Sequence, residues 1–317
     1  MFKISNEQKN GFDVWTLKDE ASKTYAEIVP SHGAMLHAFV VSNKGELVNV
    51  IDSYSSDEDF KNNVTKSFKS SKLSPFVCRI KDGKYHFAEN NYKLEGHYDG
   101  NNALHGMLYN QGFEVIKHEA KADSATLCML YKYRSEPGYP FSYDCIVTYE
   151  LEEGNNLKVL TLIINKDEGL IPIQDGWHPY FTLGDKIDNL QLEFQSKEMV
   201  EFDKDLIPTG NLIKYDKFSS LEYFGDTFFD NCFTLNFAEC QPMCVLRNHD
   251  KRIEVEIHPE KSYPYLQFYT PEHRNSIAIE NISGAPNAFN NGMGFQTLPA
   301  GESALFETAY KITLLNY

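Results

Sequence analysis

Four short segments of the sequence each place one chemically capable side chain among apolar, aromatic or glycine residues. They are residues 74–83 with Arg79, 101–106 with His105, 175–181 with His178, and 277–281 with Glu280. Histidine and carboxylate side chains are the common proton donors and acceptors of general acid–base catalysis, and arginine donates to oxygen ligands. Each segment also has a structural explanation, because a histidine beside glycine is commonly a turn residue and an arginine commonly pairs with a surface acid. Taken one at a time, these residues do not establish a reaction.

Other catalytic signatures are missing from the sequence. It has no GxSxG elbow, no HExxH helix, no Walker loop and no GxGxxG after a strand. One further group offers metal ligands: Cys240, Cys244, His249 and His258. Its spacing matches no common zinc pattern, so buried thiols on strands are the preferred interpretation. The acidic clusters at 57–59 and 203–205 are interpreted as solvated charges, with calcium ligation as the alternative.

The elements that must hold these residues are strands. Residues 126–134, 141–151 and 157–165 are β-branched and aromatic runs separated by Gly, Pro and Asn, which is typical of an antiparallel meander. Similar runs occupy residues 13–17, 24–29, 35–41, 190–194, 244–246, 253–257, 265–269 and 303–315. Residues 53–72 lack this periodicity and predict a surface loop with at most one short helix. We therefore expect an all-β protein, a single large antiparallel β-sandwich that spans residues 1–317 as one domain.

The composition excludes several classes of partner. Thirty Lys and Arg stand against 45 Asp and Glu, a net charge of −15, whereas nucleic acids and anionic membranes require a dense cationic surface. Only five residues are arginine, which argues against a phosphate-rich ligand. Residues 1–11 lack the apolar core of a secretory signal, and no long uncharged apolar stretch predicts a membrane span. The six cysteines suit reduced thiols, so we expect a cytoplasmic protein. The sequence leaves open whether the protein is a monomer or a homodimer.

Together, the four segments form an ordered set of motifs. Arg-Ile-x-x-Gly-x-Tyr begins at Arg79, and it is followed by Leu-His-Gly, His-Pro-Tyr-Phe, and Ile-Glu near Asn-Ala-Phe. In this order and at these intervals, the set resembles the aldose 1-epimerases, also called galactose mutarotases. The resemblance runs from about residue 26 to residue 312 and includes further landmarks at 137–141, Asn165, 267–271 and 298–302. It implies the galactose mutarotase-like supersandwich fold.

Carried over position by position, the resemblance implies that Glu280 is the general base and His178 the general acid. His105 would help to hold or protonate the ring oxygen, and Arg79 would bind sugar hydroxyls. Asp230 matches the hydroxyl-binding aspartate of the family, with Asp226 as a competitor for that role. The substrate would be a free monosaccharide such as glucose or galactose, and the reaction would use no metal and no cofactor.

Such a mutarotase is an isomerase that opens a cyclic hemiacetal and recloses it on the other face. A base removes the proton of the anomeric hydroxyl while an acid protonates the ring oxygen. We therefore expect Glu280 to be ionised and His178 to be protonated, since opposite charges support one another. The aromatic neighbours Trp177, Tyr180 and Phe181 either wall the sugar or belong to the core.

Three positions depart from the usual pattern of the family and leave the preferred sugar open. Cys78 stands where many relatives have Asn, Met107 replaces a second Gly, and Asn281 replaces a Pro. These changes bring the chain closer to a looser bacterial epimerase-like branch. Rival functions are a hexose-6-phosphate mutarotase, which needs a cationic phosphate site, and a non-catalytic sugar-binding protein. A glycosidase or lyase would need a second carboxylate or a Tyr or Lys base.

Overall fold

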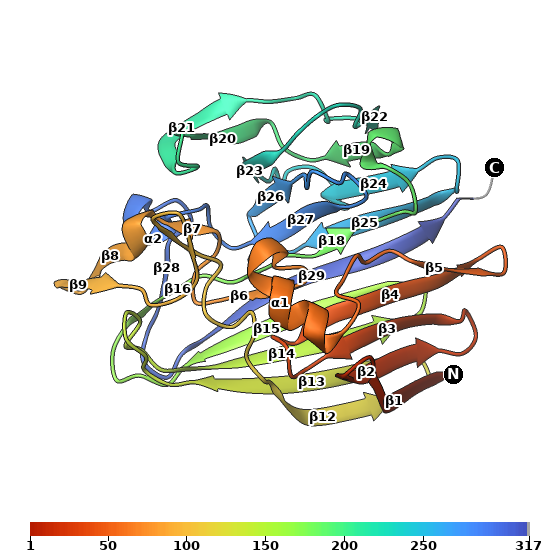
Figure 1. The fold of residues 1–317 in the computed structure, drawn as a ribbon, viewed down its shortest axis with the longest axis horizontal. Helices are drawn as coiled ribbons and strands as arrows, with labels where there is room; N and C mark the ends of the chain where they lie inside the picture. Colours follow the sequence, from red (N-terminus) through yellow and green to blue (C-terminus); the bar gives the residue numbers. More distant parts are fainter. Residues whose placement is uncertain (316–317) are drawn as a thin grey trace.

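The computed structural model describes residues 1–315, and most of them lie in antiparallel strands (Figure 1). A five-stranded sheet follows chain order: β1 (Phe2–Lys9), β2 (Phe12–Asp19), β3 (Thr24–Val29), β4 (Met35–Asn43) and β5 (Glu46–Asn49). A nine-stranded sheet has the order β12 (Glu114–Ala120), β13 (Ser124–Tyr133), β14 (Tyr143–Glu152), β15 (Asn156–Asn165), β29 (Ser303–Leu314), β25 (Ile253–Pro259), β24 (Cys244–Asn248), β19 (Gln191–Phe194) and β22 (Glu222–Tyr223).

An eight-stranded sheet has the order β21 (Pro208–Lys214), β20 (Glu198–Phe202), β23 (Asp230–Thr234), β26 (Tyr265–Tyr269), β27 (Ile277–Ile282), β17 (Gly176–Trp177) and β6 (Lys72–Leu73), with β18 (Tyr180–Phe181) also paired to β27. The smaller pairings are β10 (Tyr98–Asp99) with β11 (Asn102–Leu104) and β7 (Arg79–Ile80), β16 (Ile171–Ile173) with β28 (Gln296–Leu298), and β8 (Lys84–Phe87) with β9 (Asn90–Lys93). The helices are α1 (Asp57–Ser67) and α2 (Ala288–Asn291), with single 3₁₀ turns η1 (Lys81–Gly83) and η2 (Ile187–Asn189).

The nine-stranded sheet is covered by the other two large sheets. In Figure 1 the red and orange strands β1–β4 lie over the yellow-green strands β12–β15, and β2 contacts both β13 and β14. At the other end, Phe194 of β19 packs against Phe233 of β23 and Phe268 of β26. Strands β14 and β15 bury every second side chain, as a sheet with one face on the core requires. The prediction of an all-β sandwich is confirmed.

Strand β27 is the most enclosed element near the predicted chemistry. All six of its residues are buried, and it has β26 on one side and β17 and β18 on the other. An inner strand of this kind has its backbone fixed by hydrogen bonds on both edges. A functional side chain on β27 is therefore held rigidly.

The segment 53–72 differs in part from the expected surface loop. Its helix α1 is 11 residues long, begins at the N-cap Ser56, and carries acidic residues in its first turn, where the helix dipole favours them. Its buried residues Phe60 and Val64 are four positions apart and pack against the five-stranded sheet. Ser70, Ser71 and Lys72 are buried, so the end of this segment belongs to the core. Within residues 1–315, no helix is long and apolar enough to cross a membrane.

Candidate active site

The five residues selected by the motif set surround one cavity of about 340 Å³. Its lining includes Arg79, His105, His178, Asp230 and Glu280. Pockets for small molecules typically enclose about 300–1,000 Å³, so this volume suits a compact ligand. The structure thus gathers side chains that lie far apart in the sequence.

Backbone pairing within the eight-stranded sheet holds Glu280 and His178 together. Glu280 lies on β27 and faces Gln267 of β26 in the strand register. His178 lies in the short connection between β17 and β18, which both pair with β27. The backbone N–H of His178 donates to the carbonyl of Ser71 at 3.1 Å, and its carbonyl accepts from Ser70 at 2.9 Å. Backbone pairing on both sides therefore fixes the imidazole beside the carboxylate.

A fully buried ion pair fastens the same segment from behind. Lys72 Nζ lies 2.5 Å from Asp175 Oδ1, and neither side chain is exposed to solvent. The Tyr263 hydroxyl also donates to this carboxylate, and Lys72 Nζ lies 4.3 Å from the centre of the Trp177 ring. Buried charges are tolerated when they are paired and hydrogen-bonded, as they are here. This pair ties β6 to the residues that lead into His178.

The short strands β7 and β11 position Arg79 and His105. Arg79 stands opposite Leu104, and the N–H of His105 donates to the carbonyl of Cys78 at 2.9 Å. Gly106 has φ +75°, and a Cβ there would lie 2.4 Å from the carbonyl oxygen of Ser74. Only glycine fits so close an approach with a positive φ, which explains the glycine of the Leu-His-Gly motif.

The geometry separates the two competing aspartates. Asp230 lies on β23 and accepts a hydrogen bond from Gln267 Nε2 at 2.9 Å. Its Oδ2 is 3.7 Å from Arg79 Nη2, which also lies 3.2 Å from Asp99 Oδ2. Burial raises the pKa of Asp230, and the Arg79 charge opposes that rise. Asp226 is exposed and does not line the cavity, so only Asp230 is placed to contact a ligand there.

His178 and Glu280 form a dry acid–base pair. His178 Nε2 lies 3.3 Å from Glu280 Oε1, with side-chain exposures of 5% and 2%. Burial raises the pKa of Glu280 well above its usual range, the Asp230 charge raises it further, and Arg79 opposes both. Burial lowers the pKa of His178 to about 4. Burial thus disfavours the charged form of both side chains. The ionised glutamate and protonated histidine expected from the sequence therefore need stabilisation that burial does not supply, and this arrangement stays a prediction.

His105 is the third proton-carrying group of the cavity. Its ring centre lies 4.9 Å from that of His178 and 4.6 Å from that of Phe68. Burial lowers the pKa of His105 well below its usual range, and the neighbouring His178 and Arg79 lower it further. Its Nδ1 and the Oε2 of Glu280 are buried without a hydrogen-bond partner. These two atoms are therefore available to a ligand.

Several lining residues have no role in the sequence-based prediction. They are Thr65, Lys66, Ser67, Phe68, His97, Asp99, Gln267 and Tyr269. Gln267 and Tyr269 lie within a motif landmark, and that landmark was the available signal. Phe68, the residue that caps the C-terminus of α1 with φ +50°, lies in a segment that showed no periodicity. Its contribution depends on where the helix ends.

The expected metal alternatives are not gathered into sites. Cys240 is exposed whereas Cys244 is buried, and His258 pairs with Glu256 at 3.0 Å. Asp57 pairs with Lys61, and Asp203 accepts from the backbone of its own turn. Within residues 1–315, the one group with metal-ligand geometry is Cys78, His105 and Glu280, inside the candidate cavity.

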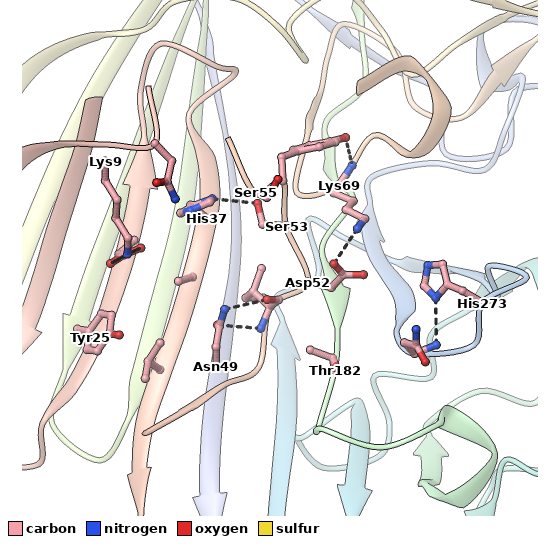
Figure 2. A pocket seen from close by; sticks show the side chains of 17 residues that line it. Lys9, Tyr25, His37, Asn49, Asp52, Ser53, Ser55, Lys69, Thr182 and His273 are labelled. Carbon is pink, nitrogen blue, oxygen red and sulfur yellow. Dashed lines mark hydrogen bonds and ion pairs between the residues drawn. The ribbon is translucent and has the colours of Figure 1, made fainter. Parts of the chain in front are cut away.

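A second and larger cavity of about 900 Å³ borders the segment that follows β5 (Figure 2). Its charged groups are paired with one another: Lys69 lies 2.7 Å from Asp52, and Lys9 lies 2.7 Å from Glu27. His37 contacts the Ser53 hydroxyl at 3.1 Å, and Figure 2 shows this contact and the Lys69–Asp52 pair. None of the five predicted residues lines this cavity. The smaller cavity is therefore the candidate active site despite its size.

Comparisons with known proteins show the family of the chain. The family model described as aldose 1-epimerase matches residues 13–311. An aldose 1-epimerase of Streptococcus thermophilus is 25% identical over 295 residues, covering 87% of this chain and 76% of the relative. A galactose mutarotase-like protein of Clostridium acetobutylicum has a TM-score of 0.88 at 20% identity, covering 99% of both chains. The galactose 1-epimerase of Lactobacillus acidophilus has a TM-score of 0.84 at 20% identity, covering 100% of both chains.

Proposed function

This chain belongs to the aldose 1-epimerase family of isomerases, and from that premise we propose that it interconverts the α- and β-anomers of a free aldose such as glucose or galactose. The observation that carries the proposal is the buried contact between His178 Nε2 and Glu280 Oε1, with an unpartnered carboxylate oxygen beside the cavity. A dry pair that holds one mobile proton is what a reversible ring opening requires.

The reaction begins when the sugar hydrogen-bonds to atoms of the pair that have no partner within the protein. A hydroxyl that donates to Glu280 Oε2 favours the ionised carboxylate, as does the nearby Arg79 charge. The proton of Glu280 then moves to His178 across the 3.3 Å contact. Sugar binding thus favours the ionised glutamate and protonated histidine and offsets the burial that disfavours both charges.

Glu280 next removes the proton of the anomeric hydroxyl while His178 donates its proton to the ring oxygen. The bond between C1 and the ring oxygen breaks, and C1 becomes an aldehyde. Rotation about the C1–C2 bond turns the other face of the aldehyde toward the hydroxyl. The same two groups then reverse their transfers, so the pair ends with one proton, as it began.

The remaining residues hold the sugar. His105 lies beside His178 and serves the ring oxygen, while Arg79 and Asp230, whose side chains lie 3.7 Å apart, bind hydroxyls. A hydroxyl both donates and accepts, so neighbouring cationic and anionic groups suit it. The chemistry in this scheme requires only proton transfers, and these residues supply them without a metal or a cofactor.

The charges around the cavity support a neutral sugar over a hexose 6-phosphate. Its lining carries the cations Lys66 and Arg79 together with the acids Asp99, Asp230 and Glu280. Arg79 is already engaged by two of these acids. A phosphate dianion would have to compete with Asp99 and Asp230 for the Arg79 guanidinium.

Polarimetry on freshly dissolved α-anomers tests the proposal. The protein is first treated with a chelator and returned to metal-free buffer, and then glucose, galactose and glucose 6-phosphate are compared. We expect faster mutarotation of a free aldose than of the phosphate. The absence of any acceleration would support a non-catalytic sugar-binding protein. A rate that is lost with the chelator and restored by one divalent ion would overturn the metal-free scheme.

We also place the protein in the cytoplasm, with a monosaccharide as its small-molecule partner. All six cysteines are free, and four of them are buried. Free buried thiols support a reducing compartment.

A further inference from the structure

One group of side chains in the cavity has a geometry that proton transfer does not require. The sulfur of Cys78, a ring nitrogen of His105 and a carboxylate oxygen of Glu280 all lie within 4.8 Å of one another. Their exposed fractions are 3%, 8% and 1%, so the three ligand atoms meet in a space that is shielded from water. Within residues 1–315 this is the one group of three or more such ligands.

Two atoms of the group lack a hydrogen-bond partner. His105 Nδ1 and Glu280 Oε2 are buried and unpartnered, and both residues line the cavity. An unpartnered buried polar atom costs about 1–3 kcal/mol, so a ligand that bonds to these two atoms would remove that cost. The sugar explains the open oxygen of Glu280, but it gives no reason for a thiol beside it.

The backbone presents Cys78 and His105 as a fixed unit. Both residues have positive φ values, 47° and 61°, which non-glycine residues other than Asn, Asp and His seldom adopt. They are joined by the 2.9 Å hydrogen bond from the His105 N–H to the Cys78 carbonyl. Glu280 approaches from the rigid strand β27. The three ligands therefore come from segments that the fold already holds in place, so the chain does not need to fold around an ion.

We propose that Cys78, His105 and Glu280 bind one divalent transition-metal ion of the zinc type, and that the bound ion inhibits the enzyme. Thiolate, imidazole and carboxylate are the three ligand types of protein zinc sites, which often leave a fourth position for water. Hard cations such as Mg²⁺ prefer oxygen ligands and keep several waters, so this mixed set selects against them.

The geometry requires only modest adjustment. Zinc bonds of about 2.0–2.3 Å in a tetrahedron place ligand atoms roughly 3.3–3.8 Å apart. The present separations of up to 4.8 Å close to that range with side-chain shifts of about 1 Å. The fourth position faces the cavity, where His178 Nε2 lies 3.3 Å from Glu280 Oε1. Water or His178 completes the shell.

Metal binding itself does not depend on the proposed function, whereas inhibition does. The ion would occupy the carboxylate that acts as base and the imidazole that serves the ring oxygen. Sugar and metal would therefore exclude one another. The zinc site would be a brake on an acid–base reaction that needs no metal.

A titration of metal-free protein with Co²⁺ tests the site directly. Cobalt replaces zinc in such sites, and a cysteine ligand gives a sulfur-to-cobalt charge-transfer band. We expect this band to saturate at one equivalent in the parent protein and to disappear in Cys78→Ser. Cys232→Ser is the matched control, because Cys232 is also buried near the cavity wall but lies outside the ligand group. It should keep the band.

Two checks keep this test decisive. Cys78→Asn removes the thiol with a residue that tolerates positive φ, so it covers the case in which Cys78→Ser does not fold. Loss of a ligand should weaken Zn²⁺ binding by at least about 10-fold in either variant, measured by competition with a chelating dye. The site would be overturned by the absence of a cobalt band in the parent protein or by a band that persists without Cys78. It would also be overturned if Mg²⁺ bound as tightly as Zn²⁺ in the dye competition.

Polarimetry then tests the inhibition. Zn²⁺ should slow mutarotation by the parent protein, EDTA should restore the rate, and added sugar should raise the Zn²⁺ concentration needed. In the Cys78 variants the ratio of rates with and without Zn²⁺ should move toward one. Zinc that binds at the cobalt site without slowing the reaction would refute the proposed inhibition. A parent protein with no mutarotase activity would refute the proposed function, while the cobalt titration would still decide the metal site.

Discussion

The molecule contains two glutamate–histidine contacts of similar length in opposite surroundings. On β25, His258 Nε2 lies 3.0 Å from Glu256 Oε2, and that carboxylate also accepts from the Thr313 hydroxyl and lies 3.5 Å from Lys311 Nζ. In the cavity, Glu280 has the 3.3 Å contact with His178 and an oxygen without a partner. The hydrogen bond from His258 lowers the pKa of Glu256 to about 2, whereas burial raises that of Glu280.

This difference shows that the surroundings, and not the residue pair, determine what a carboxylate can do. Glu256 is stabilised as an anion by donors and by a cation, so its basicity is low. Glu280 lacks those donors, so burial raises its pKa and makes it the stronger base of the two. Both histidines are followed by proline in the sequence, so the local motif does not distinguish the structural pair from the proposed catalytic one.

The largest expected effect is on the rate after removal of each carboxylate. Glu280→Gln keeps the shape of the side chain but removes the base, so turnover should fall by about 10²–10⁴-fold. Glu256→Gln should leave turnover within a few-fold of the parent. Polarimetry gives both rates, and the melting temperature of each variant serves as the folding control. A folded and fully active Glu280→Gln variant would end the catalytic assignment.

A third carboxylate, Asp175, sharpens the comparison because it is buried but paired with a cation. Lys72→Met leaves this carboxylate in the core without its cation, which should destabilise the fold by about 3–5 kcal/mol. Lys69→Met breaks the partly exposed pair with Asp52 and should cost at most about 1 kcal/mol. Urea unfolding measures both. Equal losses for the two variants would show that burial does not set the cost of an unpaired charge here.

Much of this organisation could be predicted from the sequence. Alternating apolar runs predicted the exact bounds of β3 and β26. The ordered motifs selected five residues that line one cavity of the structure. The polar strand β1 was missed because seven of its eight residues are at least partly exposed, which leaves no apolar alternation to detect. The roles of those five residues stay predictions until the variants are made.

Other features depend on contacts that no local pattern encodes. Lys72 was assigned to a surface loop because its partner Asp175 is about 100 positions away in the sequence. The raised pKa of Glu280 depends on burial without hydrogen-bond donors, which no local sequence pattern displays. Phe68 enters the cavity only because α1 ends there.

The next largest effect is expected from the two aspartates that were alternatives for the sugar-binding role. A hydrogen bond to a charged group contributes about 1.5–3 kcal/mol, so Asp230→Asn should raise KM by roughly 10- to 150-fold and change kcat less. Asp226→Asn is the matched control, and its exposed position predicts no change. Initial rates across a range of sugar concentrations separate the two constants. A larger effect at Asp226 would mean that the sugar lies elsewhere.

The smallest expected effect is the dependence of stability on pH, in which the two glutamates should differ in sign. The folded state lowers the pKa of Glu256 to about 2 from a reference of 4.5, so its contribution is complete above the reference value and is lost as the pH falls toward the folded value. The free energy of unfolding that separates the parent from Glu256→Gln should therefore shrink between about pH 5 and pH 3. Because Glu256 is partly screened by solvent, the change should be small.

The folded state raises the pKa of Glu280, so any stability it adds is present below 4.5 and is lost as the pH rises through the folded value. Urea unfolding of both Gln variants in chelator, from acidic to neutral pH, measures the two slopes. The difference in unfolding free energy between the parent and Glu256→Gln should grow with pH, and that between the parent and Glu280→Gln should shrink. A change of both differences in the same direction would contradict the opposite pKa shifts of the two glutamates.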